Sequence, residues 1–246
     1  MITVLDVETT FVVNDKRRSD PSPFCPENKL VSVQYSQDSQ EPQFVWFHHS
    51  TAKFDTVKAS QQIQDVLDKT TTLVGHNIKF DLMWLWETGF SYDGAVYDTM
   101  LGEYMLLRGQ KWGISLADCC ERRNITLKKS QLVEDYIKQG KGFDVIPKEI
   151  VEEYGIGDII STRELYDEQK RLYTKTGYYD LAKHLNLMNK FLLVLADTER
   201  NGIKIDLDQL HKVKDDYEKE KAELEQTLFD VAQEVMGDTP INFASP

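Results

Sequence analysis

The segment ITVLDVE, residues 2–8, constrains the fold most, because it places two acidic residues inside a near-continuous apolar run. Such runs of Ile, Val and Leu are typical of strands in the middle of a sheet, where both faces are buried. Asp6 and Glu8 are two positions apart, so their carboxylates point to the same face of a strand. Burying two like charges is costly unless a cation lies between them. The segment therefore predicts a central strand that carries part of a metal site.

The following residues predict strands first and alternating strands and helices later. Residues 30–36 and 43–49 are rich in β-branched and aromatic residues, and we expect them to form an antiparallel meander with the first strand. The residues after them predict, in order, helix 60–67, strand 71–76, helix 80–88, strand 95–98, helix 99–107 and helix 116–123. This order predicts an α/β fold in which a mixed sheet carries helices on its faces.

A long helix is predicted from Pro147 to about Tyr173, and it carries a second acidic motif. Tyr154 and Asp158 are four residues apart, so they are neighbours on one face of this helix. Val151, Thr162 and Leu165 share that face and predict that it looks into the fold. A glycine inside a helix costs about 1 kcal/mol relative to alanine. Two of them, at 155 and 157, predict that another segment passes close to this turn.

Composition limits the classes of protein. The chain has 246 residues, 41% of them hydrophobic, which is ample for a sizeable core. A net charge of −12 argues against binding nucleic acid through a broad basic surface, so only local basic groups are candidates: residues 16–18, 122–123 with 128–129, and 138–141. Three cysteines without a CxxC spacing predict neither a zinc site nor disulfides. The absence of a membrane-length apolar run or signal peptide predicts a cytoplasmic protein without a membrane partner.

Three segments in order along the chain, LDVETT, GHNIKFD and YGIGD, resemble the motifs of the DEDD group of 3′–5′ exonucleases. The third segment resembles the subgroup whose last motif carries a tyrosine, and DTMLGEYML is similar to the helix that follows the second motif. The resemblance covers Met1 to about Tyr173. It implies a ribonuclease-H-like fold with a mixed five-stranded sheet flanked by helices.

The resemblance also implies the catalytic residues, which are Asp6, Glu8, Asp81, Tyr154 and Asp158. Asp6 would bridge two divalent cations, Glu8 and Asp158 would complete the site of the first, and Asp81 would support the second. Oxygen ligands favour Mg²⁺ or Mn²⁺ over zinc. Tyr154 would orient the attacking water rather than take its proton, because an unperturbed phenol has a pKa near 10.

Position within the motifs further implies a set of contacts to the terminal nucleotide, made by the Thr9 backbone, Phe11 or Val12, His76, Asn77 and Phe80. Asn77 would meet the sugar or phosphate of that nucleotide. His76 is equally consistent with a hydrogen-bonded structural residue at the end of a buried strand. Phe80 is equally consistent with a core residue.

The segment LADTERNGIKIDLDQL, residues 195–210, resembles the junction between the exonuclease domain and the thumb of phage or bacterial family A DNA polymerases. The charged helix after it and the terminal INFASP extend this resemblance. We therefore expect an exonuclease domain at residues 1–177 and a helical appendage, the beginning of a thumb, at 178–246. INFASP is expected to mark a cut inside a larger protein, with palm and fingers in the same or a separate chain.

The predicted function is metal-dependent 3′–5′ proofreading exonuclease activity, which releases nucleoside 5′-monophosphates from a single-stranded or frayed 3′ end of DNA in a bacterial or phage-infected cell. Two alternatives stay open. One is an RNA 3′–5′ exonuclease of the same chemical class, which only a contact to the 2′-hydroxyl would separate. The other is a non-catalytic scaffold domain of a polymerase, which the presence of all four carboxylates disfavours.

Overall fold

The computed structural model describes residues 1–13, 19–125 and 131–237. Contacts between residues divide the chain into two compact units, Met1–Arg200 and Asn201–Pro246. Three features singled out in the sequence, the basic residues 16–18 and 128–129 and the terminal INFASP, lie outside the described residues.

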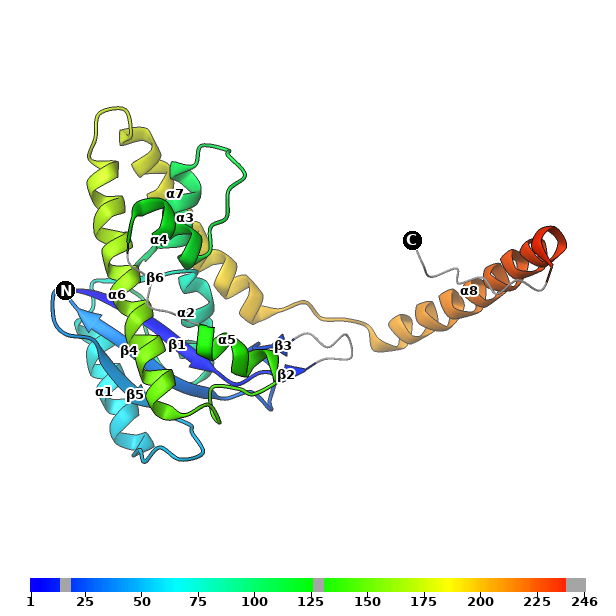
Figure 1. The fold of residues 1–246 in the computed structure, drawn as a ribbon, viewed down its shortest axis with the longest axis horizontal. Coiled ribbons are helices and arrows are strands. Elements are labelled where there is room, and N and C mark those ends of the chain that lie inside the picture. Colours follow the sequence, from blue (N-terminus) through cyan, green and yellow to red (C-terminus); the bar gives the residue numbers. More distant parts are fainter. Residues whose placement is uncertain (14–18, 126–130, 238–246) are drawn as a thin grey trace. The chain divides into compact units, whose positions relative to one another are not determined.

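A mixed five-stranded sheet forms the centre of the first unit, in the order β5-β4-β1-β6-β7 (Figure 1). Its strands are β1 (Ile2–Thr9), β4 (Leu30–Gln37), β5 (Gln43–Trp46), β6 (Thr72–Gly75) and β7 (Ala95–Asp98). β1 pairs antiparallel with β4 and parallel with β6, so it is the central strand. The predicted central strand, meander and mixed sheet are therefore confirmed.

The helices of the first unit follow the predicted order. They are α1 (Thr56–Lys69), α2 (Ile78–Glu87), α3 (Thr99–Leu106), α4 (Leu116–Arg123), α5 (Gln131–Lys138), α6 (Lys148–Tyr173) and α7 (Tyr179–Asn201). Only α5 was not predicted. A small hairpin of β2 (Val12–Val13) and β3 (Ser19–Asp20) was also missed, because a strand of two residues leaves no periodicity to detect.

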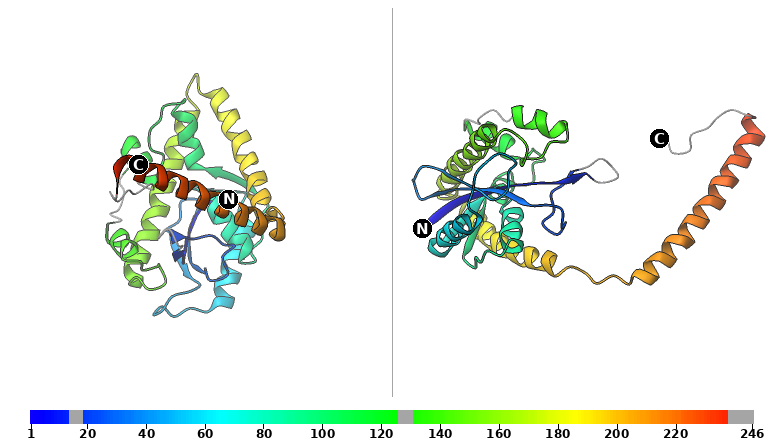
Figure 2. Two further views of the ribbon diagram at one scale, coloured as in Figure 1. Left: turned by 90° about the vertical axis from the view of Figure 1, so that its right-hand side faces the viewer. Right: turned by 90° about the horizontal axis from the view of Figure 1, so that it is seen from below.

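Helices cover both faces of the sheet (Figure 2). Leu5 and Val7 of β1 belong to the core cluster that contains residues of α1 and α2. Val4 belongs instead to the cluster that contains Ile159 of α6. Because side chains alternate along a strand, the even-numbered Asp6 and Glu8 share the α6 side with Val4.

Two arginines that were candidates for nucleic-acid binding are engaged inside the fold. Arg122 Nη1 and Arg123 Nη2 of α4 each donate to Glu103 Oε1 of α3 at 2.8 Å. The Glu103 side chain is fully buried, so its negative charge is stabilised by these two arginines rather than by water. The pair therefore joins α3 to α4 and offers no free basic surface.

The last helix of the first unit packs on the sheet assembly. Leu192 of α7 belongs to the α1/α2 core cluster, and Leu185 to the α6 cluster. At its end, Glu199 accepts from Lys79 Nζ at 2.5 Å and Arg200 Nε donates to Glu87 Oε1 at 2.9 Å. The contacts thus place the end of the first unit at Arg200, whereas the appendage was expected to begin at residue 178.

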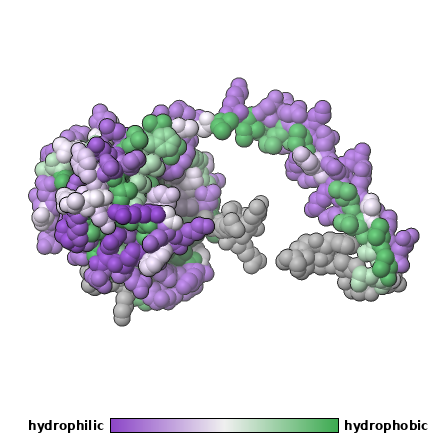
Figure 3. Space-filling model, turned by 90° about the horizontal axis from the view of Figure 1, so that it is seen from above, coloured by the Kyte–Doolittle hydropathy of each residue, from purple (hydrophilic) through white to green (hydrophobic). Residues whose placement is uncertain are grey.

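The second unit consists of α8 (Leu207–Met236), and none of the residues of this helix is buried. Asp206 caps it by accepting from the Gln209 backbone N–H at 3.0 Å. Leu210, Leu224, Leu228 and Val231 are exposed along it, among charged residues (Figure 3). Neither α8 nor any other described helix combines the length and apolarity needed to cross a membrane.

Candidate active site

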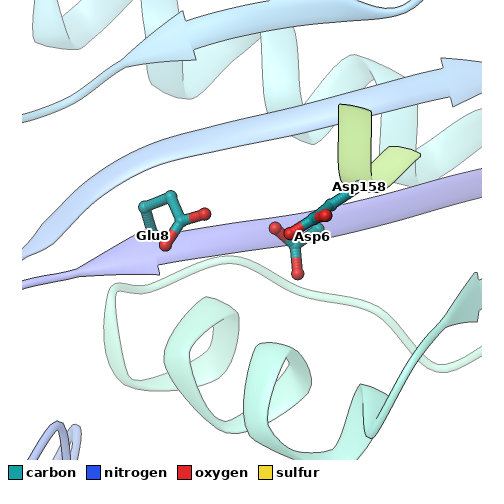
Figure 4. Close-up of side chains that lie close together, drawn as sticks. All are labelled: Asp6, Glu8 and Asp158. Carbon is teal, nitrogen blue, oxygen red and sulfur yellow. The ribbon is translucent and has the colours of Figure 1, made fainter. Parts of the chain in front are cut away.

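The structure brings together three of the predicted carboxylates (Figure 4). Asp6 and Glu8 come from β1, and Asp158 comes from α6, which crosses β1 and β4. One oxygen from each of the three side chains lies within 4.8 Å of the other two. Glu8 is only 7% exposed, while Asp6 and Asp158 are half-buried. This separation allows a single cation to touch all three.

Asp81 reaches the same strand from the first turn of α2 and is 2% exposed. Its Oδ1 accepts from the backbone N–H of Val7 at 3.0 Å. The pairing of β6 with β1 runs only from Ile2 to Val4, so the Val7 amide meets a side chain instead of a strand. The bond fixes Asp81 beside Asp6 and Glu8, although it is outside the three-carboxylate cluster.

Burial raises the pKa values of all four acids, and mutual repulsion raises those of Asp6 and Glu8 further. Burial raises the pKa of Asp6 well above its ordinary value, and the charges of Asp81 and Asp158 raise it further. The pKa of Glu8 is raised by burial and then by Asp6, and that of Asp81 by burial despite the Val7 amide. Burial raises the pKa of Asp158 to about 6. The site therefore binds protons more tightly than exposed carboxylates do.

These residues fit a divalent metal. Among the described residues, no lysine, arginine or histidine forms an ion pair with any of the four carboxylates. The negative charges are thus left without a cationic partner in a largely buried place. Carboxylate oxygens without nitrogen or sulfur ligands match the preference of Mg²⁺ or Mn²⁺.

Tyr154 lies one helical turn before Asp158. Its phenol lowers the pKa of Asp158, against the larger effect of burial. Burial raises the pKa of Tyr154, and the neighbouring Asp158 raises it further. A phenol of this kind does not accept a proton from water near neutral pH, which favours an orienting role.

The variant Tyr154→Phe should lower kcat about 10- to 100-fold, as is usual when a partner of a metal-binding side chain is removed. The four carboxylates remain, so the loss should be smaller than that of any carboxylate. Single-turnover hydrolysis of labelled DNA measures this effect. Tyr166→Phe, on the same helix, is the matched control and should keep the full rate. A Tyr154→Phe enzyme as inactive as a variant lacking Asp6 would contradict an orienting role.

The residues predicted to meet the terminal nucleotide from β1 lie beyond Glu8. Thr9 ends the strand, where the pairing with β4 shifts register between Glu8 and Thr9. Phe11 and Val12 follow it and are both half-buried. The irregular end of the strand thus leads directly from the cluster to these residues.

Three residues of the second motif, GHNIKFD, were expected to contact the nucleotide. His76 and Phe80 are engaged within the fold, whereas Asn77 is exposed to solvent. His76 Nε2 donates to the Ile114 carbonyl at 3.0 Å, and its Nδ1 lies 2.9 Å from the Thr99 hydroxyl. Burial lowers the pKa of His76 to about 4, so the ring is neutral. Phe80 packs against the core. Asn77 is exposed in the left-handed conformation, with φ of 63°, and its side chain does not cap α2.

Gln34 is a site residue that the sequence reading missed. It lies on β4 opposite Asp6, is fully buried, and its Nε2 donates to Asp6 Oδ2 at 3.1 Å. It also explains the predicted close approach, since a Cβ on Gly155 would lie 2.6 Å from Gln34 Nε2. The available signal was a polar residue at the middle of the apolar run LVSVQYS.

The unpredicted helix α5 also borders the site. Together with α6 it lines a hollow beside the cluster, formed by Gln131, Leu132, Val133, Ile150, Glu153, Tyr154 and Asp158. Apolar side chains and two polar site residues thus face the same space, which is a common arrangement where a ligand binds.

Comparison with known proteins identifies the family. A family model described as 3′–5′ exonuclease matches residues 22–172, more than half of the chain. The chain belongs to this family. The match contains Asp81, Tyr154 and Asp158 but begins after Asp6 and Glu8, which the fold brings beside them. As a member of this exonuclease family, the chain has the ribonuclease-H-like architecture that its sequence predicted.

This exonuclease-family chain resembles DNA polymerase I of Chloroflexus aurantiacus, with 27% identity over 161 residues, covering 64% of the chain and 16% of that protein. The chain thus spans well under two thirds of this relative. Mg²⁺-bound NrnC of Brucella melitensis has a TM-score of 0.55 at 16% identity, covering 82% and 86% of the two chains. The POL domain of Pol1 from M. smegmatis, solved with primer-template and dNTP, has a TM-score of 0.58 at 16% identity, covering 98% and 35%. These structural likenesses concern the fold alone.

Proposed function

We propose that this chain is a metal-dependent 3′–5′ exonuclease that removes nucleotides from DNA. The observation that carries the proposal is the cluster of Asp6, Glu8 and Asp158, whose oxygens lie within 4.8 Å of one another without a basic partner among the described residues. Membership in the 3′–5′ exonuclease family supports the same chemistry. Water attacks the terminal phosphorus, the bond from phosphorus to O3′ breaks, and a nucleoside 5′-monophosphate leaves.

The four carboxylates would hold two divalent cations, Mg²⁺ or Mn²⁺. Asp6, Glu8 and Asp158 would bind the first, and Asp6 with Asp81 would bind the second. Cations bound there would stabilise the charge that develops on the phosphate and lower the pKa of the attacking water. Tyr154 would orient that water, and Asp81, fixed to the Val7 amide, would keep its carboxylate at a constant place beside β1.

The terminal nucleotide would bind between the end of β1 and the start of α2. The Thr9 backbone and Phe11 or Val12 would pack against it, and the exposed Asn77 would contact its sugar or phosphate. We do not include His76 among these contacts, because the protein itself occupies both of its ring nitrogens. Phe80 would offer the nucleotide no more than one edge of its ring, because the ring packs on the core.

DNA is the proposed substrate because the curated relative is a DNA polymerase. In such a protein the domain would proofread, and the unit Asn201–Pro246 would begin the thumb that leads to palm and fingers. The likeness to NrnC favours neither DNA nor RNA. RNA therefore forms the second arm of the test.

The test uses two 5′-labelled oligonucleotides of the same sequence, one DNA and one RNA, incubated with Mg²⁺ or with EDTA. We expect a ladder of products that shorten from the 3′ end of DNA with Mg²⁺ and no shortening with EDTA. Chromatography should identify the released products as nucleoside 5′-monophosphates.

A 3′-blocked DNA of the same sequence is the control for direction and should resist digestion. Faster shortening of RNA than of DNA would replace the DNA assignment by the RNA exonuclease. Intact oligonucleotides at every Mg²⁺ and Mn²⁺ concentration would leave only the scaffold alternative.

A further inference from the structure

Gln34 lies directly beside two carboxylates of the proposed metal site, Asp6 and Glu8, although it carries no charge. It is the direct cross-strand partner of Asp6 on β4, and no part of it is exposed. Burying an amide is costly unless its polar atoms are hydrogen-bonded. Its position therefore needs a reason that packing alone does not give.

The reason lies in the two bonds that the side-chain amide donates. Gln34 Nε2 lies 3.1 Å from Asp6 Oδ2 and 3.4 Å from Glu8 Oε1. A primary amide has two N–H groups, so it can serve both carboxylates at once. Gln34 is thus the described residue that connects the two acids of β1 to each other.

The carboxylates also fix which way the amide points. Gln34 Oε1 is buried and has no hydrogen-bond partner among the described residues. If the amide were reversed, this oxygen would face two anionic side chains and repel them. One orientation is therefore preferred whenever Asp6 and Glu8 are ionised.

Helix α6 holds the amide in place from the other side. A Cβ on Gly155 would lie 2.6 Å from Gln34 Nε2 and 2.7 Å from Gln34 Cγ. Gly155 stands between Tyr154 and Asp158 in sequence, so the same turn that supplies these residues also closes over Gln34. The amide is enclosed by β1, β4 and α6.

A neutral donor suits a site that must bind cations. An arginine or lysine in this place would neutralise the carboxylates and compete with a metal. An amide reduces the repulsion between Asp6 and Glu8 and orients their oxygens while their full negative charge remains.

Building on the proposed function, we propose that Gln34 is a positioning residue that aligns Asp6 and Glu8 for metal binding through its two amide N–H bonds. Gln34 does not touch the substrate. Its contribution is to the affinity for the cation and, through it, to kcat.

The test measures Mn²⁺ binding by calorimetry and electron paramagnetic resonance, alongside hydrolysis and melting in EDTA. Gln34→Met keeps the length of the side chain but removes both donors. We expect its Mn²⁺ dissociation constant to increase about 10-fold or more and kcat to fall about 10- to 100-fold. KM for DNA and the melting temperature in EDTA should change little, because an unpartnered buried oxygen is lost together with the two bonds.

Ser32→Ala is the matched control. Ser32 is on the same strand, is fully buried and lies opposite Glu8, but its hydroxyl has no partner among the described residues. This variant should bind Mn²⁺ as the wild-type protein does. A glutamine with a merely structural role would give the reverse pattern for Gln34→Met, a lower melting temperature with unchanged Mn²⁺ affinity, and would overturn the proposal.

Gln34→Asn serves if the methionine variant does not fold. It keeps the amide but draws it back by one methylene, about 1.5 Å, so Mn²⁺ affinity must again decrease, and equal affinity overturns the proposal. The measurements distinguish failure of the proposed function from failure of the role given to Gln34. Wild-type protein that binds no Mn²⁺ overturns both, whereas wild-type and Gln34→Met proteins that bind it equally overturn only the role of Gln34.

Discussion

Asp6→Asn is expected to lower the rate of hydrolysis roughly 1000-fold or more, which corresponds to about 4 kcal/mol of transition-state stabilisation. Asp6 belongs to the three-carboxylate cluster, and the charges of both Asp81 and Asp158 raise its pKa, so it is placed to share a cation with each of them. Asparagine keeps the size of the side chain, and its carbonyl oxygen can still accept from Gln34. The fold should therefore remain while the centre of negative charge is lost.

The same substitution should raise the melting temperature of the metal-free protein. Removing one of several buried like charges relieves repulsion that no basic residue in the described part of the chain compensates. Single-turnover hydrolysis and thermal melting in EDTA test the two effects together. Asp65→Asn is the matched control, because Asp65 is an exposed aspartate on α1 that accepts from Gln61, also on the helix surface. Asp6→Asn protein that keeps a tenth of the wild-type rate, or that melts earlier in EDTA, would contradict this account.

The parts of the fold that follow from local periodicity were predictable from the sequence. The near-continuous apolar run identified β1 as central, and the alternation of side chains along a strand placed Asp6 and Glu8 on one face. A spacing of four placed Tyr154 and Asp158 on the same side of α6, and two glycines indicated the close approach that Gly155 makes. Each inference needed only residues close together in the chain.

The parts that depend on long-range register could not be predicted. Gln34 becomes the partner of Asp6 only because β1 and β4 pair with that register. His76 is occupied through the carbonyl of Ile114, 38 residues away. The apolar stripe of α7 shows that the helix packs on something, but not whether its partner is the sheet unit or the following helix. In each case the partner is fixed by tertiary packing, which no local pattern encodes.

The metal-free protein is expected to lose stability as the pH rises from about 4 to about 7. The ordinary pKa of an aspartate is 3.8, while that of Asp158 in the folded protein is about 6. Between these values the unfolded chain has released its proton and the folded protein still holds it, so a rise in pH favours unfolding. For Asp158 this difference in pKa lowers the free energy of unfolding by about 3 kcal/mol. The loss is complete once the pH is above the pKa of the folded protein. Asp6, Glu8 and Asp81 are raised as well and act in the same direction.

Mg²⁺ should offset much of this loss, because a cation that binds the ionised folded protein and not the unfolded chain stabilises it by about 2.7 kcal/mol at 100 times its dissociation constant. Denaturant unfolding between pH 4 and 8, with EDTA or Mg²⁺, gives the free energies. Other acids have lowered pKa values, such as Asp118 and Glu168, and oppose the trend in the whole protein, so the decisive quantity is the difference between wild type and Asp158→Asn. That difference should grow with pH in EDTA and become smaller with Mg²⁺, since the variant lacks both the costly charge and the ligand. Parallel pH profiles for the two proteins would mean that Asp158 is not held in its protonated form by the fold.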